Sequence, residues 1–391
     1  MGERKLHILF ATIDFVENNG PTTGMPKYIY RTAKILVSWG NEVTVVTCSN
    51  RTVEYDFFGI HVHRVRRVPY KKVGNLYEDE IIARKRDSLI IHNEIEKIIK
   101  RSKVDIIQYA SPYGIAYYHD FLVPAIMRMS MYSKMWPVIG GDAIKDARSY
   151  MEKKAAERCN GIIAPSCLIA KVFGDDICRE VRVIETPRFW ENSDENESIY
   201  RNYLKGKEYI LFYGTITGHK GMQLIADSIF NILDRYKDCY YVLVGAGDIR
   251  WISTIKANAK EYADRVIYLS ALGFSELVPI IKGAELITLP SQMENLSNAC
   301  IESMALGQIV LGTRGASFEQ LIEHKKNGVL CEIDDSKTFI EGIEFVFGLN
   351  CRQRNNICTA AKETVDRLSP EKVTKELLTY YREIIDKYAA R

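Results

Sequence analysis

The sequence predicts an α/β protein built from two doubly wound parallel sheets, and three observations lead to that class. Short apolar runs rich in β-branched residues alternate with longer segments of helical period along the whole chain. Most of these runs are continuously apolar, which is typical of strands that are covered on both faces. The chain has 391 residues. Because one core rarely grows past about 250–300 residues, this length favours two domains.

The predicted strands follow one another in a regular order. They cover residues 6–12, 42–47, 60–68, 105–110, 137–140, 161–166 and 181–184, then 209–214, 240–245, 266–269, 286–290, 309–312 and 329–333. Segments of ten or more residues with helical period separate most of them, as crossovers between parallel strands require. Residues 121–136 contain four methionines, and this density predicts a packed helix.

The break between the two domains is predicted at residues 188–206. Residues 191–198 are polar and lack apolar anchors, which is typical of a linker. The N-terminal domain would therefore span residues 1–190 and the C-terminal domain residues 205–370. Ser369 suits a helix N-cap and Pro370 the first helical position, so a terminal helix is expected over 371–391.

Composition and charge exclude several classes of protein. The chain carries 53 Lys+Arg and 50 Asp+Glu, and a net charge of +3 is too small for a protein that binds nucleic-acid phosphates. No run of 18 apolar residues and no signal-peptide core occurs, so we expect a cytoplasmic protein. Nine cysteines without a CxxC pair argue against a disulfide scaffold or a zinc ribbon. No D-x-D occurs, so neither a metal nor another cofactor is expected.

Basic residues gather in the first half of the chain. They are Arg64, Arg66, Arg67, Lys71, Lys72, Arg84, Lys85, Arg86, Lys97, Lys100, Arg101 and Lys103. Acidic residues interrupt the run, which favours an ordinary solvated face. An anionic acceptor or peripheral contact with the inner face of a membrane is the alternative, which stays open.

Ligands of a doubly wound sheet bind at the carboxyl ends of its strands, so the loops that follow the strands are the candidate site. Four such loops carry suggestive residues: 18–26 with Gly24, 214–221 with Lys220, 290–307 with two glutamates, and 312–319 with Arg314. Glycine near a helix N-terminus lets backbone amides approach an anion. None of these loops has the G-x-G-x-x-G or P-loop spacing, and each alone is equally well a plain surface loop.

The third loop is the most informative. Glu294 lies in the loop and Glu302 in the helix after it, with seven residues between them. We expect this helix to begin near Ser297 or Asn298 and to close at Gly307. Its N-terminus would receive a diphosphate while the carboxylates bind hydroxyls, as in a nucleotide sugar. Alternatively, Glu302 is a first-turn acid that compensates the helix dipole, and Glu294 is a surface residue.

These segments, in this order, resemble the family-4 (GT4) nucleotide-sugar glycosyltransferases of the GT-B fold. The resemblance rests on residues 24 and 28–47 in the first half, and on 213–221, 244–247, 266–269, 274–277, 289–307, 312–319 and 368–380 in the second. Residues 289–307 look like the family's E-x7-E block, and 213–221 like its glycine loop ending in Lys-Gly. The resemblance implies two Rossmann-like domains that face a cleft, with a C-terminal helix crossing back to the N-terminal, acceptor-side domain.

The resemblance also implies a function and a set of site residues. The chain would be a retaining, metal-independent hexosyltransferase that moves a sugar from a nucleoside-diphosphate donor to an acceptor hydroxyl of a glycan, glycolipid, protein or small molecule. Glu302 would hold the donor ribose, Lys220 would neutralise the leaving diphosphate, and Glu294 would lie beside the transferred sugar. The catalytic residues would be Glu294, Lys220 and Asp142. The donor-binding residues would be Gly24, Gly214, Lys220, Gly245, Leu272, Asn295, Leu296, Ser297 and Glu302.

The sequence departs from the family pattern at two places. Thr215 stands where the family carries an arginine, for which Arg314 or His219 would have to substitute. Residues 136–142 lack the family's histidine, although Asp142 is present. Two other functions therefore stay open, a non-catalytic GT-B accessory subunit and a GT-B nucleotide-sugar epimerase. Neither the donor base, whether uridine, guanosine or another, nor the sugar, the acceptor or the oligomeric state follows from the sequence.

Overall fold

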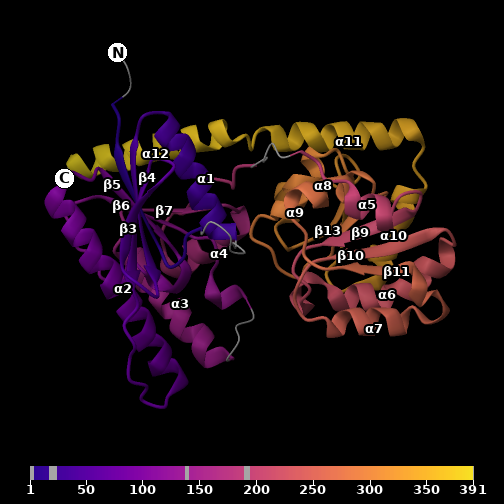
Figure 1. Ribbon diagram of the computed structural model, residues 1–391, viewed down its shortest axis with the longest axis horizontal. Coiled ribbons are helices and arrows are strands. Elements are labelled where there is room, and N and C mark those ends of the chain that lie inside the picture. The colour runs from indigo at the N-terminus through magenta and orange to yellow at the C-terminus, as the bar shows by residue number, and fades with distance from the viewer. Residues whose placement is uncertain (1–3, 17–23, 137–140, 189–193, 391) are drawn as a thin grey trace. The chain divides into compact units, whose positions relative to one another are not determined.

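A computed structural model describes residues 4–16, 24–136, 141–188 and 194–390. The chain forms two compact units (Figure 1). Unit 1 comprises Met1–Pro187 together with Pro370–Arg391, and unit 2 comprises Arg188–Ser369. Each unit has a parallel sheet covered by helices, so the predicted α/β class with two doubly wound sheets is confirmed.

Unit 1 is built on an eight-stranded sheet with the order β3-β4-β2-β1-β5-β6-β7-β8. Its strands are β1 (His7–Thr12), β2 (Glu42–Ser49), β3 (Val53–Phe57), β4 (Ile60–Arg66), β5 (Ile106–Ala110), β6 (Ala125–Arg128), β7 (Gly161–Ala164) and β8 (Arg182–Val183). All neighbours pair in parallel except β3 and β4, which form an antiparallel hairpin at one edge. The chain winds outward in both directions from β1, so β1 and β5 flank the point where ligands of such sheets bind.

Helices cover both faces of this sheet. They are α1 (Gly24–Ser38), α2 (Leu76–Arg101), α3 (Asp142–Glu157), α4 (Cys167–Ile177) and α12 (Pro370–Ala389), with short turns η1 (Pro112–Gly114) and η2 (Ser133–Met135). Ile107 faces the core that α2 and α3 share. Gln108, the next residue of β5, points to the opposite face, where its Oε1 accepts a hydrogen bond from Tyr381 of α12 at 2.6 Å. The C-terminal helix thus belongs to the N-terminal fold, as predicted, and packs beside α1.

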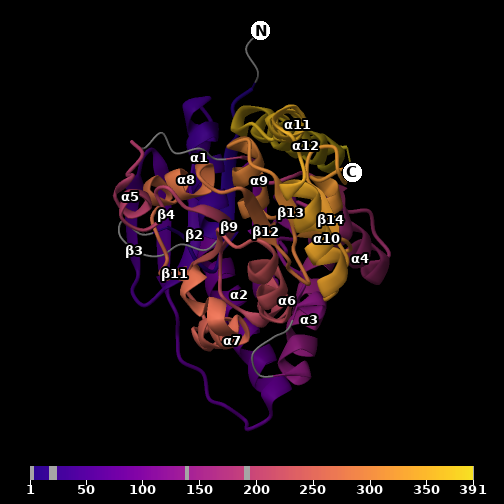
Figure 2. The same cartoon turned by 90° about the vertical axis from the view of Figure 1, so that its right-hand side faces the viewer.

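Unit 2 is built on a six-stranded, fully parallel sheet with the order β11-β10-β9-β12-β13-β14. Its strands are β9 (Glu208–Tyr213), β10 (Cys239–Val244), β11 (Val266–Leu269), β12 (Leu286–Leu289), β13 (Val310–Thr313) and β14 (Val329–Cys331). Its helices are α5 (Ser198–Tyr203), α6 (Met222–Arg235), α7 (Arg250–Asn258), α8 (Phe274–Lys282), α9 (Asn298–Ala305), α10 (Ser336–Phe347) and α11 (Cys351–Asp366), with turns η3 (Gly218–Lys220), η4 (Lys260–Arg265) and η5 (Phe318–Gln320). Helices α6 and α7 lie on one side of the sheet, and α8 and α9 on the other (Figures 1 and 2).

The methionine-rich segment corrects one prediction. Residues 121–136 form strand β6 and turn η2 rather than a helix. Met127 and Met129 are fully buried, so the prediction was right about packing. It was wrong about the element, because a buried central strand and a buried helix are equally apolar over four residues.

One strand was missed, and two further predictions have separate outcomes. The edge strand β3 was not predicted, because its residues alternate between half-buried and exposed and carry two acidic side chains. Residues 198–203 were expected within a linker but form helix α5, which packs against α8. The strand expected over residues 137–140 lies outside the described residues.

Part of the basic stretch of the first half is neutralised by pairing. Arg67, Arg84, Lys97 and Lys100 each form an ion pair with a carboxylate of α2. Arg64 is buried, and its guanidinium donates to the carbonyl oxygens of Phe15 and Val16 at 3.3 and 3.0 Å. This pairing favours the ordinary charged face over one continuous cationic surface.

Two further observations concern membrane-spanning helices and the state of the cysteines. Within the described parts of the chain, every helix is either too short or too polar to cross a lipid bilayer. All nine cysteines are free thiols, and five of them are buried.

A buried carboxyl in unit 1 gives a pH-dependent prediction. Glu152 of α3 is fully buried and accepts hydrogen bonds from the Ser133 backbone N–H at 2.9 Å and the Ser133 hydroxyl at 2.7 Å. Burial raises the pKa of Glu152 from 4.5 to about 8, although both hydrogen bonds oppose this shift. The folded chain therefore holds a proton here that the unfolded chain releases, so the contribution of Glu152 to stability is greatest below pH 4.5 and is lost as the pH rises through about 8.

We expect Glu152→Gln to remove this pH dependence. The stability of the wild type relative to the variant should fall by about 1.4 kcal/mol per pH unit inside that window. Urea denaturation of both proteins at several pH values measures the difference, and other titrating groups cancel in the comparison. Parallel stability curves would show that Glu152 titrates normally.

Candidate donor-binding site

The candidate site lies at the carboxyl edge of the unit 2 sheet. Strands β9 and β12 are hydrogen-bonded neighbours, so the loops that follow them meet at this edge. The first loop brings Lys220 and the second brings Glu294, and the Lys220 Nζ donates to Glu294 Oε1 at 2.5 Å. The two side chains are 24% and 14% exposed. Both side chains are thus mostly sheltered from solvent, but each keeps an exposed fraction that a ligand could contact.

The β12–α9 loop is fixed on both sides of Glu294. The Ser291 hydroxyl donates to Glu294 Oε1 at 3.0 Å. The Gln292 N–H donates to the carbonyl oxygen of His219 at 2.9 Å, which ties this loop to the β9–α6 loop. Thr313 of β13 donates its hydroxyl hydrogen bond to the Ser291 carbonyl oxygen. The Glu294 carboxylate is therefore oriented before any ligand binds.

Glycines allow the loops of this edge to approach one another. Gly221 has φ +82°, and a Cβ there would overlap the carbonyl oxygen of Pro290. Gly245 has φ +155°, and a Cβ there would overlap the carbonyl oxygen of Gly214. The predicted donor residues Gly214 and Gly245 are thus in direct backbone contact, where a side chain would separate the β9 and β10 loops.

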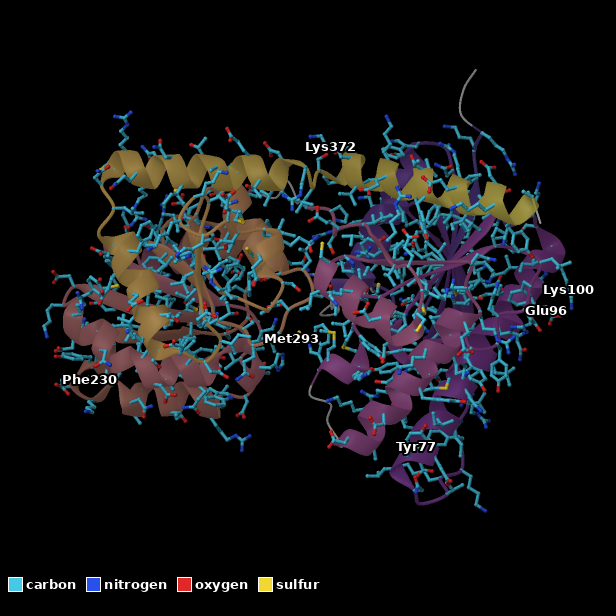
Figure 3. The ribbon with its side chains drawn as sticks, turned by 180° about the vertical axis from the view of Figure 1, so that it is seen from behind. Tyr77, Glu96, Lys100, Phe230, Met293 and Lys372 are labelled. Carbon is cyan, nitrogen blue, oxygen red and sulfur yellow. The ribbon has the colours of Figure 1, made fainter. Side chains whose placement is uncertain are left out.

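The N-terminus of α9 lies next to Glu294. Ser297 is the N-cap, and its hydroxyl accepts a hydrogen bond from the Cys300 N–H at 3.3 Å. The helix begins at Asn298, as predicted, and ends before Gly307, which has φ +78°. Met293, labelled in Figure 3, lies in the loop before the cap together with Asn295 and Leu296. A helix start of this kind offers backbone amides and a positive dipole end to an anion.

Glu302 lies one turn beyond that helix start. It is the fifth residue of α9, and the first turn holds no acidic residue, so the interpretation of Glu302 as a first-turn acid is wrong. Tyr213, the last residue of β9, lies beside it and donates to the Ala299 carbonyl oxygen at 2.6 Å. Burial raises the pKa of Tyr213 well above its usual range, and the charge of Glu302 adds to the shift. The phenol therefore stays neutral against α9.

The residues expected near the donor nucleobase lie at the other end of the carboxyl edge of the unit 2 sheet. Leu272 follows β11 and is half-buried. Tyr268 of β11 donates its hydroxyl hydrogen bond to the Gly245 carbonyl oxygen at 3.0 Å, which links this end to the glycine contact. Three strand spacings separate β11 from β12, or about 14 Å. The predicted residues thus form a row long enough for an extended ligand.

Neither proposed substitute for the arginine at Thr215 supplies a second positive charge beside Lys220. The Arg314 Nε pairs with Glu332 at 3.1 Å. His219 lies next to Lys220, but burial lowers the pKa of His219, and the Lys220 charge lowers it further. This histidine is therefore uncharged at neutral pH.

The remaining predicted residues belong to unit 1. Gly24 is the first residue of α1, and Asp142 is the exposed first residue of α3, where an acid also compensates the helix dipole. The rest of their predicted loops, residues 17–23 and 137–140, lies outside the described residues. His119 is the histidine nearest in sequence to residues 136–142, where the family's histidine is lacking. It is buried: its Nδ1 forms a hydrogen bond with the Tyr109 hydroxyl at 3.1 Å, and burial lowers its pKa to about 4.

Two residues of this edge were missed by the sequence analysis. Tyr213 fixes the helix that carries Glu302, and Ser291 orients Glu294. Tyr213 lies near the end of the predicted strand 209–214, and Ser291 directly follows the predicted strand 286–290, which was the available signal. Each looked like an ordinary strand terminus because its partner lies in a different segment.

Known proteins resemble this chain in sequence and in structure. Residues 207–347, which include Lys220, Glu294 and Glu302, match the family model for glycosyl transferases group 1. An uncharacterized glycosyltransferase of Methanocaldococcus jannaschii is 23% identical over 380 residues, covering 90% of this chain and 92% of the relative. A GDP-mannose-dependent alpha-mannosyltransferase of Corynebacterium glutamicum is 22% identical over 402 residues, covering 98% and 90%.

Two solved structures have the same architecture. Sucrose-phosphate synthase from Thermosynechococcus elongatus superimposes with a TM-score of 0.77 at 16% identity, covering 99% of this chain and all of that one. The HepE protein of Anabaena, solved in complex with UDP, gives a TM-score of 0.71 at 14% identity, covering 97% and 100%. At these identities the likeness establishes the fold.

The two doubly wound units and the matched family model together define a glycosyltransferase of the GT-B fold. More particularly, the chain resembles the GT4-type glycosyltransferases of group 1, and the predicted resemblance is confirmed.

Proposed function

We propose that the chain is a retaining glycosyltransferase that moves a hexose from a nucleoside-diphosphate donor to an acceptor hydroxyl. The observation that carries this proposal is the convergence of Lys220, Glu294 and the N-terminus of α9 at one edge of the unit 2 sheet. Departure of a nucleoside diphosphate places negative charge on phosphate oxygens, and oriented donors stabilise that charge. Lys220 and the α9 amides are groups of this kind.

The row of predicted residues also suits the parts of the donor. The backbone near Leu272 would read the base, Glu302 would bind the ribose hydroxyls, and the backbone of Asn295, Leu296 and Ser297 would bind phosphate or sugar. Glu294 would lie beside the transferred sugar, held by Lys220 and Ser291. The complex of HepE with UDP supports a nucleotide donor for a protein of this fold.

The chemistry we propose at this edge needs no metal or other cofactor, because Lys220 and the helix dipole supply the positive charge. The catalytic role of Asp142 and the donor role of Gly24 stay predictions. A cytoplasmic location and contact with a membrane surface also stay predictions. The mannosyl transfer from GDP-mannose carried out by the Corynebacterium relative makes guanosine and uridine diphosphates the first donors to test.

Nucleotide binding and product release test this function together. We expect UDP or GDP, or a sugar derivative of one of them, to raise the thermal midpoint of unfolding with concentration. Incubation with the matching nucleotide sugar and a mixture of acceptors should release free nucleoside diphosphate, measured by chromatography. The anomeric configuration of the product, read by NMR, should equal that of the donor.

The other outcomes separate the alternatives. If neither a nucleotide nor a nucleotide sugar shifts the thermal midpoint of unfolding, the donor site is contradicted and an accessory subunit is favoured. An altered but intact nucleotide sugar would identify an epimerase. Inversion at the anomeric carbon would contradict retention only.

A further inference from the structure

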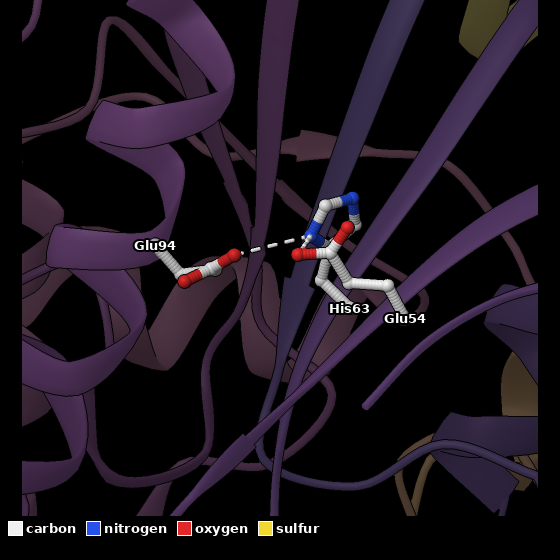
Figure 4. A group of neighbouring side chains, drawn as sticks. All are labelled: Glu54, His63 and Glu94. Carbon is white, nitrogen blue, oxygen red and sulfur yellow. Dashed lines mark hydrogen bonds and ion pairs between the residues drawn. The ribbon is translucent and has the colours of Figure 1, made fainter. Parts of the chain in front are cut away.

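Three side chains with metal-binding atoms meet on one face of unit 1. Glu54 comes from β3, His63 from β4 and Glu94 from α2. Figure 4 shows the Glu94 carboxylate directed from its helix towards the His63 imidazole, with the Glu54 carboxylate in front of the same ring. Their ligand atoms all lie within 4.8 Å of one another.

The distances fit a small divalent cation. The His63 Nδ1 lies 3.1 Å from Glu94 Oε1 and 3.6 Å from Glu54 Oε1. Zinc binds nitrogen and carboxylate oxygen at about 2.0–2.2 Å, so two such ligands on a tetrahedral ion lie about 3.3 Å apart. The two observed separations fall on either side of this value. Small rotations of the side chains would complete the geometry.

The three side chains differ in exposure in a way that suits ion capture. The His63 and Glu94 side chains are 15% and 6% exposed, whereas Glu54 is 58% exposed on the edge strand. Lys97 donates to the second oxygen of Glu94, Oε2, at 2.8 Å. This bond orients Glu94 and leaves Oε1 facing the histidine. Two sheltered ligands thus face one solvent-exposed ligand across the space that an ion would occupy.

The β3–β4 hairpin places a second acid opposite a second histidine, two residues along each strand. Glu54 pairs with His63 across the two strands, and Asp56 pairs with His61. Residues two apart on a strand share a face, so both histidines and both acids lie on the same side of the hairpin. The Asp56 Oδ2 lies 3.6 Å from the His61 Nδ1, and both side chains are 56% exposed. Two histidines spaced in this way on a strand supply a second imidazole near the first.

We propose that Glu54, His63 and Glu94 form a structural site for a divalent transition metal, best matched by Zn²⁺, that ties the edge hairpin β3–β4 to helix α2. One imidazole and two carboxylates are the ligand types that zinc takes, and water or His61 completes the four positions. The ion would accept the lone pair of the His63 Nδ1, so this ring would carry its proton on Nε2 and release any proton on Nδ1 to solvent. The site is separate from the proposed donor chemistry, and it goes beyond the sequence analysis, which predicted no metal.

Zinc titration of the untagged full-length chain tests the proposal by calorimetry. The exposed thiols Cys167, Cys178 and Cys351 should first be replaced by serine, because thiolates also bind zinc. We expect one zinc ion per chain, a higher thermal midpoint with zinc, and an enthalpy that depends on the buffer through the released proton. Co²⁺ should bind at the same site without a sulfur charge-transfer band.

Matched variants decide which residues hold the ion. His63→Gln and Glu94→Gln should each weaken zinc binding by roughly 100-fold. Glu96→Gln is the control, because Glu96 lies two residues on in the same helix, is 47% exposed and pairs with Lys100 (Figure 3). If Glu94→Gln fails to fold, Glu54→Gln on the exposed edge strand should weaken binding instead.

The proposal is wrong if the serine-substituted chain binds no zinc, which would leave these residues as an ion-paired cluster only. It is also wrong if zinc binds equally well to the control and to the His63 and Glu54 variants. Neither result bears on sugar transfer, because donor binding is measured separately in unit 2.

Discussion

Replacing Lys220 with alanine should lower kcat/KM for sugar transfer by about 100- to 1,000-fold, which is the usual cost of removing one group that stabilises developing charge. The Lys220 ammonium is the charged donor that the β9–α6 loop presents at this edge, and its neighbour His219 is neutral. Without it, the leaving diphosphate would depend on backbone amides alone. Glu294→Ala should reduce turnover by a similar factor, because the sugar would lose its carboxylate contact.

The fold should survive these substitutions. The two side chains are 24% and 14% exposed, so loss of the pair should cost more than the ~1 kcal/mol of an exposed ion pair but less than the about 3–5 kcal/mol of a fully buried one. Lys337→Ala is the control, because Lys337 is 83% exposed and its Nζ lies 4.0 Å from Glu341 Oε1, so this lysine forms a weak, exposed ion pair. Steady-state kinetics together with circular dichroism measure both effects. Wild-type rates in both the Lys220 and the Glu294 variants would overturn the assignment of the site.

Gly221→Ala should destabilise the chain by about 2–4 kcal/mol and abolish transfer. The left-handed φ of +82° costs about 1 kcal/mol for alanine, and the overlap of its Cβ with the Pro290 carbonyl oxygen adds about 1–3 kcal/mol. Relief of that overlap would separate the β9–α6 and β12–α9 loops. Lys220 and Glu294 lie on those two loops, so the variant should lose donor binding as well.

Gly206→Ala is the matched control for this substitution. Gly206 has nearly the same φ, +80°, but nothing lies within 4 Å of the position of its Cβ. Its replacement should cost only the backbone term, about 1 kcal/mol, and should leave donor affinity unchanged. Urea denaturation and nucleotide titration of both variants give the comparison. Equal stability losses would show that the Pro290 contact is not what requires glycine.

The strands of the fold were predictable where burial on both faces made them continuously apolar. Strand β11 occupies the predicted residues, and β5 and β12 differ by one residue at one end. Strand β6 was missed because Ala-Ile-Met-Arg has no β-branched majority and lies in a methionine-rich segment. Strand β3 was missed because an edge strand is half solvated and tolerates acids.

The positions of the candidate site residues in the fold were predictable, but their contacts were not. Spacing along the chain brought attention to Glu294 and Glu302, and the cap at Ser297 determined where the helix starts. The pairing of Lys220 with Glu294 joins residues 74 positions apart, and only the adjacency of β9 and β12 brings them together. No sequence periodicity specifies which strands become neighbours across a switch in sheet order. The roles of these residues stay predictions until the variants are measured.

The division of the chain affects the order in which its parts can fold during synthesis. Unit 1 needs α12, which fills its core with Tyr381, yet α12 is translated after the whole of unit 2. Unit 2 is one uninterrupted segment, so it can complete its sheet as soon as residue 369 has left the ribosome. Unit 1 is therefore translated first but completed second, and until α12 is made its sheet exposes the apolar face that this helix covers, a surface of the kind that chaperones bind.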